Sequence, residues 1–426
     1  MEVRPGYKQT EVGIIPEAWK VSHLRIHLLQ DATYGVVKAG TFQRVGIPML
    51  RGGDIKAGSI ADDQPLITAE KSREYARTVL KERDVVIALV GYPGESAVVP
   101  ARLAGANISR AVGLLRPAKT LLPEFLACYL NSPNGRKEFL RPSAGSAQIV
   151  VNLGALNQLM LPLPSETEQI AISAALSDVD ALLGGLDRVI AKKRDLKQAT
   201  MQQLLTGQTR LPGFSGEWKL VRLGDHVTFL RNGVNSRAEL MPEGDVRYLH
   251  YGDVHASNAN YMAARNLPFV PSAKAAHLER LRDGDLVFAD ASEDLEGVSK
   301  SVELKGIGES VEVVSGLHTI AARFDKVVLA DGFKGLLQHC PAFAAHLRRL
   351  AAGTKVYATN RAHVASAEVS LPSPNEQQAI ARVVSDMDAE LAMLEVRRDK
   401  TKNLKKAMMQ ELLTGKTRLV NGGAHV

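Results

Sequence analysis

The side chains in this sequence that could bind a catalytic metal ion form only incomplete sets. Glu303-Leu304-Lys305 has the spacing of the end of a nuclease metal motif, and Asp290 or Asp294 could supply an upstream carboxylate. The motif has neither a Pro-Asp pair nor partner acids. His23 and His27 are four residues apart but lack the third ligand that a metal site needs. We therefore expect no metal site and no catalytic residue in this chain.

Motifs for methyl transfer and for nucleotide hydrolysis are also missing from the sequence. A DNA aminomethyltransferase would need a catalytic tetrapeptide with adjacent prolines, and the chain contains no Pro-Pro pair. Residues 305–308, Lys-Gly-Ile-Gly, are a lone Gly-x-Gly pattern of the kind that is typical of a turn. No GxxxxGK[ST] loop occurs. The chain itself is expected to bind no cofactor.

Polar residues beside turns are better candidates for a functional surface. Arg and Lys bind phosphates or guanine, and Asn and Gln pair with adenine in the DNA major groove. Candidates in the first half of the chain are Tyr34, Lys38, Arg44, Arg51, Arg73, Arg77, Tyr92, Arg110 and Gln148. Those in the second half are Arg231, Asn232, Asn235, Arg237, His250, Tyr251, Asn258, Lys355, Tyr357 and Arg361. For any one of them, an ordinary solvated side chain is the alternative interpretation.

Composition is compatible with a nucleic-acid partner and does not require one. The 426 residues carry a net charge of +7, which is mildly basic. The only cysteines, Cys128 and Cys340, cannot build a disulfide framework or a four-cysteine zinc site. The polar N-terminus has no apolar signal core, and no stretch approaches the ~20 apolar residues of a membrane span. We expect a reduced, cytoplasmic protein without a membrane partner.

A long internal repeat is the strongest feature of the sequence. Residues 163–211 match residues 371–419 without a gap, at an offset of 208, and about half of the positions are identical. A fainter match at an offset of 199 pairs Trp19 with Trp218, and residues 50–55 (LRGGDI) with residues 249–254 (LHYGDV). Each half of the chain is thus a variable region followed by a shared segment. A repeat of this length indicates a duplicated pair of domains.

The shared segment has the signals of one long helix. Ser165 precedes Glu168 by three residues, as in a capping box, and Asn375 is the expected cap of the second copy. Gly207 and Gly415 are the expected stop residues. An apolar seam with spacings of four and three runs through the first half of each copy: Ile172, Leu176, Val179, Leu183, Leu186 and Ile190, then Ile380, Val384, Met387, Leu391 and Leu394. Such a seam predicts a coiled coil.

Charge and a shift in the seam refine this prediction. The first half of each helix is acidic and the second half is basic, which favours one antiparallel intramolecular pair, although solvated helix faces would also account for the charges. Beyond Lys193 and Arg398 the apolar stripe moves to another helix face, where we expect a partner protein to bind. The residues of this stripe are Leu196, Met201 and Leu205, with Leu404, Met409 and Leu413.

The variable regions combine strand-like runs with short helical segments. Residues 85–90 and 286–289 are predicted strands, each preceded by an aspartate. Helices are expected at 123–130 and 333–350. We therefore expect a mixed α/β fold in which two similar domains are separated by two long antiparallel helices, with pseudo-two-fold symmetry. The predicted regions are 1–162 (first domain), 163–210 (central helix), 211–370 (second domain), 371–419 (C-terminal helix) and 420–426 (tail).

This arrangement resembles the specificity subunits of Type I restriction-modification systems. The resemblance rests on the N-terminal YKQTEVGIIPEAWKV, on LPSETEQIAI and LLTGQTRLPGFSGEWKLVRLGD in the centre, and on LPSPNEQQAI and LLTGKTRL at the end. It implies two target recognition domains that read an asymmetric, bipartite DNA site. It also implies helices that act as a ruler and bind two methyltransferase subunits, which hold S-adenosylmethionine, with restriction or translocase subunits as further partners.

Two other classes of function stay open at this point. The chain could be a stand-alone DNA-modifying enzyme with an unrecognised site, although the missing motifs argue against it. It could also be a helical scaffold that binds only proteins. Two diverged globular halves argue against a scaffold, because a scaffold does not need them.

Overall fold

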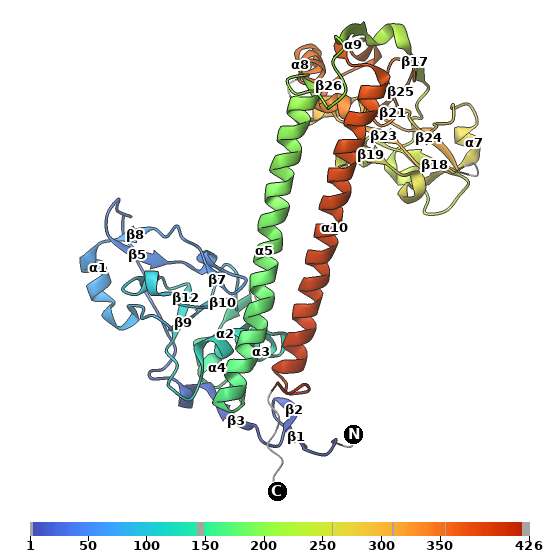
Figure 1. Ribbon diagram of the computed structural model, residues 1–426. Helices are drawn as coiled ribbons and strands as arrows, with labels where there is room; N and C mark the ends of the chain where they lie inside the picture. Colours follow the sequence, from blue (N-terminus) through green and yellow to red (C-terminus); the bar gives the residue numbers. More distant parts are fainter. Residues whose placement is uncertain (1–2, 143–148, 258, 309–310, 354, 420–426) are drawn as a thin grey trace. The chain divides into compact units, whose positions relative to one another are not determined.

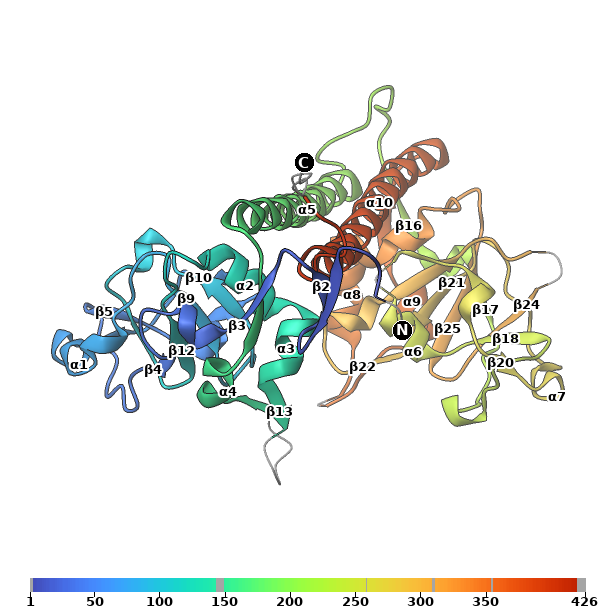
Figure 2. The same ribbon diagram turned by 90° about the horizontal axis from the view of Figure 1, so that it is seen from below.

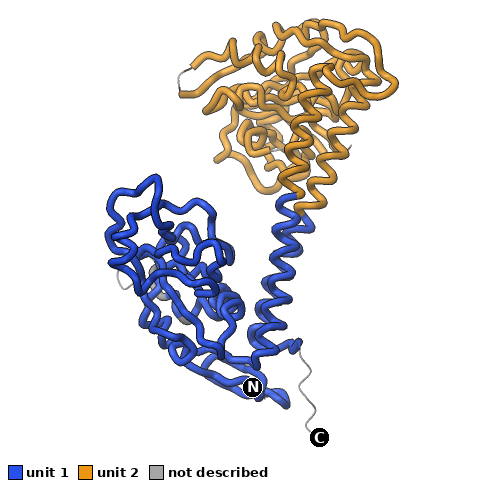
Figure 3. The backbone as a smooth tube through the Cα atoms, turned by 60° about the vertical axis from the view of Figure 1, so that its left-hand side comes forward, with its two compact units in different colours: residues 1–188, 396–426 blue, residues 189–395 orange. Residues whose placement is uncertain are grey.

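The computed structural model describes residues 3–142, 149–257, 259–308, 311–353 and 355–419. The chain divides into two compact units (Figure 3). Unit 1 contains residues 1–188 and 396–426, and unit 2 contains residues 189–395. Both long helices are therefore shared, because each unit takes one globular region together with part of each helix.

The globular part of unit 1 is a mixed α/β structure (Figures 1 and 2). Its strands are β1 (Tyr7–Thr10), β2 (Gly13–Pro16), β3 (Lys20–His23), β4 (Thr33–Tyr34), β5 (Ile47–Leu50), β6 (Ile55–Lys56), β7 (Ser59–Ile60), β8 (Leu66–Ile67), β9 (Val85–Ala88), β10 (Ser96–Val98), β11 (Asn107–Ile108), β12 (Val112–Leu115), β13 (Leu140–Pro142), β14 (Ile149–Val151) and β15 (Met160–Leu163). Its helices are α1 (Ala69–Glu74), α2 (Pro123–Asn131), α3 (Pro133–Phe139) and α4 (Leu153–Asn157).

Unit 2 is built in the same way. Its strands are β16 (Lys219–Arg222), β17 (Val227–Leu230), β18 (Val246–Leu249), β19 (Tyr261–Met262), β20 (Phe269–Val270), β21 (Leu286–Ala289), β22 (Ala291–Ser292), β23 (Ser301–Leu304), β24 (Glu312–Ser315), β25 (Thr319–Phe324), β26 (Tyr357–Ala358) and β27 (Glu368–Leu371). Its helices are α6 (Tyr251–Ala256), α7 (Ser272–Ala275), α8 (Pro341–Leu350) and α9 (Arg361–Ala365).

The two units share one sheet topology. The central sheet has the order β10-β9-β12-β4 in unit 1 and β23-β21-β25-β17 in unit 2, where β19 adds an edge strand. A second sheet has the order β11-β5-β8 in unit 1 and β24-β18-β20 in unit 2, and in both units its first pair is parallel. A third pair joins β3 to β15 and β16 to β27. This equivalence confirms the expected mixed α/β fold and shows that the diverged halves kept their backbone.

Each core is formed by the central sheet, its helices and one end of the long helices. In unit 1, Ile172 and Leu176 of α5 (Glu166–Leu205) and Leu412 of α10 (Pro374–Leu412) pack into the main hydrophobic cluster. In unit 2, Leu204 of α5 and Val384 of α10 do the same. The outer ends of the predicted coiled-coil seam are therefore core residues of the globular parts, whereas Leu186, Ile190 and Leu391 are buried nearer the middle of the helices.

Ion pairs show that the helix segments within each unit run antiparallel, as the charge pattern predicted. In unit 1, Lys405 of α10 lies 2.6 Å from Asp180 of α5, and Arg398, earlier in α10, lies 4.0 Å from Asp187, further along α5. In unit 2, Lys193 lies 2.8 Å from Glu390, and Lys197, further along α5, pairs with Asp388, which comes earlier in α10. The basic second half of each helix thus lies beside the acidic first half of its neighbour.

Local predictions of helix ends and short helices met with mixed outcomes. The Ser165 hydroxyl accepts from the Glu168 N–H at 3.3 Å, as predicted. In the second copy the cap is Ser373, which accepts from the Glu376 N–H at 3.4 Å, and Asn375 lies inside the helix. The repeat aligns Ser373 with Ser165, so the register identifies the cap that the local pattern missed.

The helix expected at 123–130 is α2, whereas the helix expected at 333–350 is broken. A 3₁₀ turn covers Lys334–His339, and α8 starts afresh at Pro341. Proline has no N–H to continue a helix and disfavours helical geometry in the residue before it, here Cys340.

In each unit, a buried carboxylate links the segments that meet where the two long helices join the globular part. In unit 1, Glu168 at the start of α5 is 1% exposed and accepts the Trp19 indole N–H at 2.8 Å. The Arg418 guanidinium, just beyond α10, binds both oxygens of this carboxylate. In unit 2, Arg210 beyond α5 binds both oxygens of Glu376 at 2.5 and 2.6 Å. The arginine of each repeated TRL sequence thus makes an equivalent bidentate contact with a buried glutamate. We call this contact the clasp of its unit.

Helix α5 is long and apolar enough to cross a membrane by length and composition alone, among the described residues. Core helices of water-soluble proteins pass the same test. Ile172 and Leu204 of α5 lie in the two protein cores, and 28% of the apolar window of this helix is buried.

Replacement of Arg418 by Ala should destabilise unit 1. The Glu168 carboxylate would stay buried without its bidentate partner, at a cost of about 3 kcal/mol. Thermal and urea unfolding of the full chain would measure this loss. Lys192→Ala on the exposed face of α5 is the matched control, and equal unfolding curves for the two variants would contradict the clasp.

Candidate nucleic-acid interface

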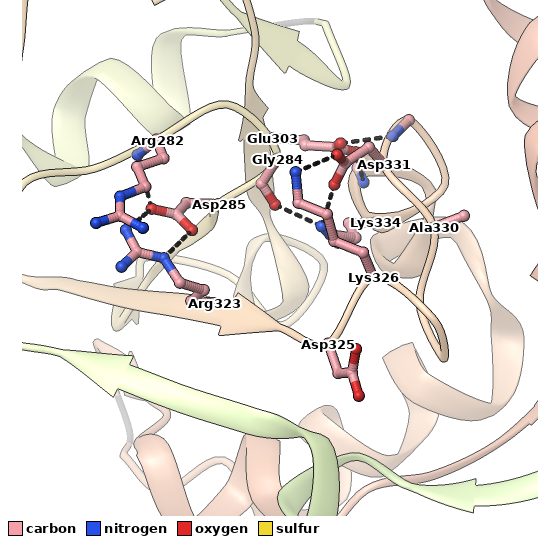
Figure 4. Close-up of polar contacts among 12 residues, drawn as sticks. Arg282, Gly284, Asp285, Glu303, Arg323, Asp325, Lys326, Ala330, Asp331 and Lys334 are labelled. Carbon is pink, nitrogen blue, oxygen red and sulfur yellow. Dashed lines mark hydrogen bonds and ion pairs between the residues drawn. The ribbon is translucent and has the colours of Figure 1, made fainter.

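A buried aspartate–arginine pair fixes the start of the central strand in each unit. In unit 1, Asp84 precedes β9 and binds Arg116 through two contacts of 2.8 Å. In unit 2, Asp285 precedes β21 and binds Arg323 at 2.9 and 2.7 Å (Figure 4). Both aspartates are almost fully buried, so these pairs serve the scaffold and explain why both predicted strands are preceded by an aspartate.

Glu303, the acid of the nuclease-like pattern, also belongs to the scaffold of unit 2 (Figure 4). Its two oxygens accept the backbone N–H groups of Gly332 at 2.5 Å and of Gly335 at 2.8 Å, and burial raises its pKa. Lys334, 1% exposed, donates to the Gly284 carbonyl at 2.9 Å and pairs with Asp331. With both oxygens engaged by the backbone, Glu303 is not disposed to bind a metal ion.

The other end of the same strands carries a cluster of converging loops. In unit 1, the Leu89 N–H donates to the Ala111 carbonyl at 2.8 Å, the Ser109 N–H to Leu50, and the Arg110 N–H to Val36. The segments around residues 34–38, 51–56, 89–95 and 109–111 therefore meet. We call this group of segments loop cluster 1.

Unit 2 has the equivalent loop cluster 2, formed by the segments around residues 231–237, 250–256, 290–297, 316–318 and 355–361. The Asp290 N–H donates to the His318 carbonyl at 3.1 Å, and the Gly316 N–H to Leu249. The Thr359 N–H donates to the Asp290 carbonyl at 2.8 Å. These bonds repeat those of loop cluster 1, so the two clusters are the same part of one fold.

An equivalent turn in each cluster is held by an aspartate and an arginine. Asp54 accepts the Arg51 N–H at 2.8 Å and contacts the Arg51 guanidinium at 2.9 Å. Asp253, its repeat equivalent, accepts the His250 N–H at 3.0 Å and binds Arg237. The shared GD motif of LRGGDI and LHYGDV thus marks a structural turn, and the residues around it are free to differ.

Most of the sequence-predicted contact residues are at least partly exposed in these clusters. In loop cluster 1 they are Tyr34, Lys38, Arg51, Tyr92 and Arg110. In loop cluster 2 they are Arg231, Asn232, Arg237, Tyr251, Lys355, Tyr357 and Arg361. Three further candidates, Arg44, Arg73 and Arg77, are exposed outside loop cluster 1, in the region of β8 and α1. DNA contact by any of these residues stays a prediction.

Two candidates do not fit a base-reading role. Asn235 and His250 are each only 6% exposed. The Asn235 side chain donates to Glu239 at 3.0 Å, and the His250 Nδ1 accepts the Gly252 N–H at 3.2 Å. Both side chains are used within the domain. Gln148 and Asn258 lie outside the described residues.

Several residues of the clusters were missed by sequence reasoning. Lys56 lies 5.1 Å from the centre of the Tyr92 ring. The His318 imidazole lies 3.2 Å from the Asp290 carboxylate, and its ring meets Tyr251 edge-on at 5.5 Å. In the sequence, Asp290 stands out only as an upstream carboxylate of the nuclease-like pattern. The aligned repeat could have found it, because it follows the strand 286–289 directly.

The displaced helical stripe separates into core residues and surface residues. Met201, Leu205, Met409 and Leu413 are at most 8% exposed and pack in the two main cores, which corrects their assignment to a partner surface. Leu196 and Leu404 are 51% and 55% exposed. The predicted change of helix face is real, but most of the stripe turns toward the chain's own domains.

The buried His250 should make unit 2 sensitive to acid. Burial, and next the Arg237 guanidinium, lowers the pKa of His250, so the folded chain binds this proton less tightly than the unfolded chain. Its stabilising effect is complete above pH ~6.5 and is lost as the pH falls below that value. His250→Gln should reduce the fall in Tm between about pH 7 and pH 5. His277→Gln, an exposed histidine of the same unit, is the control, and an unchanged pH profile for His250→Gln would count against this effect.

Comparison with known proteins gives consistent relatives. Residues 37–191 match the family model of the Type I restriction modification DNA specificity domain. The chain is 24% identical over 444 residues to the MjaX type I restriction enzyme specificity subunit of Methanocaldococcus jannaschii, and the alignment covers 97% of each protein. It is 27% identical over 236 residues to the EcoBI specificity subunit of Escherichia coli, covering 54% of this chain and about half (48%) of that relative.

Solved structures share the fold. The HsdS subunit from Thermoanaerobacter tengcongensis superposes with a TM-score of 0.50 at 18% identity, covering 95% of this chain and 98% of that one. The Type-I restriction-modification S subunit from M. genitalium gives 0.55 at 14% identity, covering 97% and 98%. Over its whole length the chain is thus similar in sequence to a Type I restriction enzyme specificity subunit, its residues 37–191 match the specificity-domain model, and its duplicated fold is that of solved S subunits.

Proposed function

We propose that this chain reads a bipartite, asymmetric DNA target, with loop cluster 1 on one half-site and loop cluster 2 on the other, and positions methyltransferase subunits on that target. The chain performs no catalysis itself. S-adenosylmethionine is bound by the methyltransferase subunits, and restriction or translocase subunits join the same assembly in the cytoplasm.

The observation that carries this proposal is one scaffold with two different loop surfaces. Strand order and backbone hydrogen bonds are equivalent in the two units. At equivalent places in the clusters, the exposed Arg51 aligns with the buried His250, the buried Leu89 with the partly exposed Asp290, and Ala111 with the exposed His318, so the accessible side chains differ. Because sequence is read by side chains at base edges, different side chains on one backbone read different bases. The two half-sites should therefore differ.

Loop cluster 1 has the chemistry of a phosphate- and guanine-binding surface. Lys38, Lys56 and Arg110 are exposed cations, and Tyr34 and Tyr92 are exposed aromatic rings, 44% and 47% accessible. Cations neutralise phosphates, so binding should weaken steeply with salt.

Equivalent exposed leucines on the long helices support one methyltransferase subunit per repeat. Leu404 belongs to unit 1 and Leu196 to unit 2, and the repeat offset of 208 aligns them. On the same helices, Val396 of unit 1 is 53% exposed and Met393 of unit 2 is 67% exposed. Each unit thus offers apolar helix surface that its own core does not cover. One of the similar solved structures, with a TM-score of 0.57, comes from work on type I assembly.

Exchange of residues 1–162 for the same region of another family member should change one half-site and leave the other unchanged. Each loop cluster is built within one unit, so its base contacts move with that unit. Methylome sequencing of a host that expresses the chain with its cognate methyltransferase gives both half-sites. A palindromic uninterrupted target, or a swap that alters both halves, would overturn the bipartite reading. Absence of DNA binding would favour the scaffold alternative, and methylation by the chain alone the enzyme alternative.

Replacement of Leu196 or Leu404 by Asp should remove one methyltransferase subunit, and the double variant both. A carboxylate on an apolar contact surface would be buried without a partner, which should weaken binding more than tenfold. Native mass spectrometry measures the stoichiometry. Gln202→Asp and Gln410→Asp, also repeat-equivalent and exposed, are the controls. Wild-type stoichiometry in the double leucine variant would refute this surface.

A further inference from the structure

We infer that Asp290, held in place by His318, reads the exocyclic amino group of a cytosine in the half-site of loop cluster 2. The inference deepens the proposed function and rests on it. It names one side chain, the base that this side chain recognises, and the residue that positions it.

The backbone of Asp290 is fixed from both sides. It follows β21 directly, and its N–H donates to the His318 carbonyl at 3.1 Å, which extends the β21–β25 ladder by one residue. On the other side its carbonyl accepts the Thr359 N–H at 2.8 Å, beside the β22–β26 pair. A side chain at the end of such a ladder has a defined position, which base reading requires.

The side chain of Asp290 is oriented and still accessible. His318 Nδ1 lies 3.2 Å from Asp290 Oδ1, and the two side chains are 53% and 30% exposed. Within the described part of the chain, Oδ2 accepts no hydrogen bond from another residue. One oxygen is thus tied to the imidazole, and the other is available to a ligand.

His318 is held in an uncommon backbone conformation. Its φ is 55°, in the left-handed region that non-glycine residues seldom adopt. The edge of the Tyr251 ring packs against its imidazole, with ring centres 5.5 Å apart. From this backbone position the imidazole Nδ1 reaches the Asp290 carboxylate. A backbone of this kind persists only where the surrounding structure holds it, and such residues cluster at functional sites.

The fold itself does not require this pair. In unit 1 the same backbone bond joins Leu89 to Ala111 at 2.8 Å, and Leu89 is 6% exposed. The equivalent scaffold therefore closes with two apolar residues. The Asp–His pair belongs to unit 2 alone, as expected for a residue that sets the sequence of one half-site.

The chemistry of a carboxylate selects the base. An ionised Asp only accepts hydrogen bonds, so it needs a donor at the base edge. In the major groove the donors are the amino groups of cytosine and adenine, and adenine places its N7 acceptor next to the amino group. A carboxylate would be repelled by N7, whereas cytosine presents only its amino group. Asp290 therefore fits cytosine, and His318 acts as a positioning residue.

The test uses the full chain with its cognate methyltransferase subunits and a library of randomised duplex DNA. The bound sequences give both half-sites of the wild type, and the exchange of residues 1–162 shows which half-site belongs to unit 2. Asp290→Asn should lower discrimination for cytosine at one base pair of that half-site by about tenfold, because its amide NH₂ would face the base's amino group. The other half-site should not change.

His318→Asn is the second variant, because Asn tolerates the left-handed backbone. It should weaken discrimination at the same base pair as Asp290→Asn and at no other. Glu312→Gln removes another exposed, ion-paired carboxylate of unit 2, outside loop cluster 2, and should leave the whole profile unchanged.

A modified base in the DNA tests the contact between Asp290 and the cytosine amino group directly. Replacement of the assigned cytosine by a 2-pyrimidinone nucleotide, which lacks the 4-amino group, should weaken wild-type binding about tenfold and leave Asp290→Ala nearly unaffected. An unchanged profile for both Asp290→Asn and His318→Asn, with wild-type half-sites intact, would overturn this inference alone. A wild-type chain without sequence preference would instead overturn the proposed function.

Discussion

The bidentate contact between a buried glutamate and an arginine is the interaction on which the rest of the structure depends. Glu168 with Arg418, and Glu376 with Arg210, each join the start of one long helix to the segment that follows the other. In unit 2 that segment continues through the chain into Trp218. In unit 1 the covalent link is missing, and the N-terminal hairpin replaces it: the Tyr7 hydroxyl donates to the Gly415 carbonyl at 2.8 Å. The same clasp therefore forms whether or not the arginine segment leads directly along the chain into the segment with the tryptophan.

Within each unit, one end of the central sheet stabilises the fold and the other end carries the loops with variable side chains. The end that starts with Asp84 or Asp285 is fixed by buried ion pairs, whose arginine partner cannot be lost without leaving an uncompensated charge. The opposite end carries the loops, whose backbones are fixed by repeated hydrogen bonds but whose side chains differ. This division allows recognition residues to change while the fold is retained.

The buried polar group of unit 2 shows how far the two scaffolds have diverged. Glu303 and Lys334 occupy the positions of Val98 and Leu126 in unit 1, as the strand registers and the Gln169 and Gln377 contacts indicate. The same site is thus filled by an apolar pair in one unit and by ions in the other. The ionic version is tolerated because Glu303 accepts two backbone N–H groups and Lys334 is paired with Asp331.

The sequence by itself determined the duplication, the long helices, their antiparallel pairing and the resemblance to Type I specificity subunits, because periodicity, capping residues and a repeat are local or self-referential signals. Tertiary structure alone decided which leucines of one stripe are core, as Leu205 is, and which are surface, as Leu196 is, since burial depends on distant segments. It also decided that His250 is enclosed and that Asp290 meets His318. Those two residues are far apart in the sequence, and only the ladder between β21 and β25 brings them together, so no local pattern could have paired them.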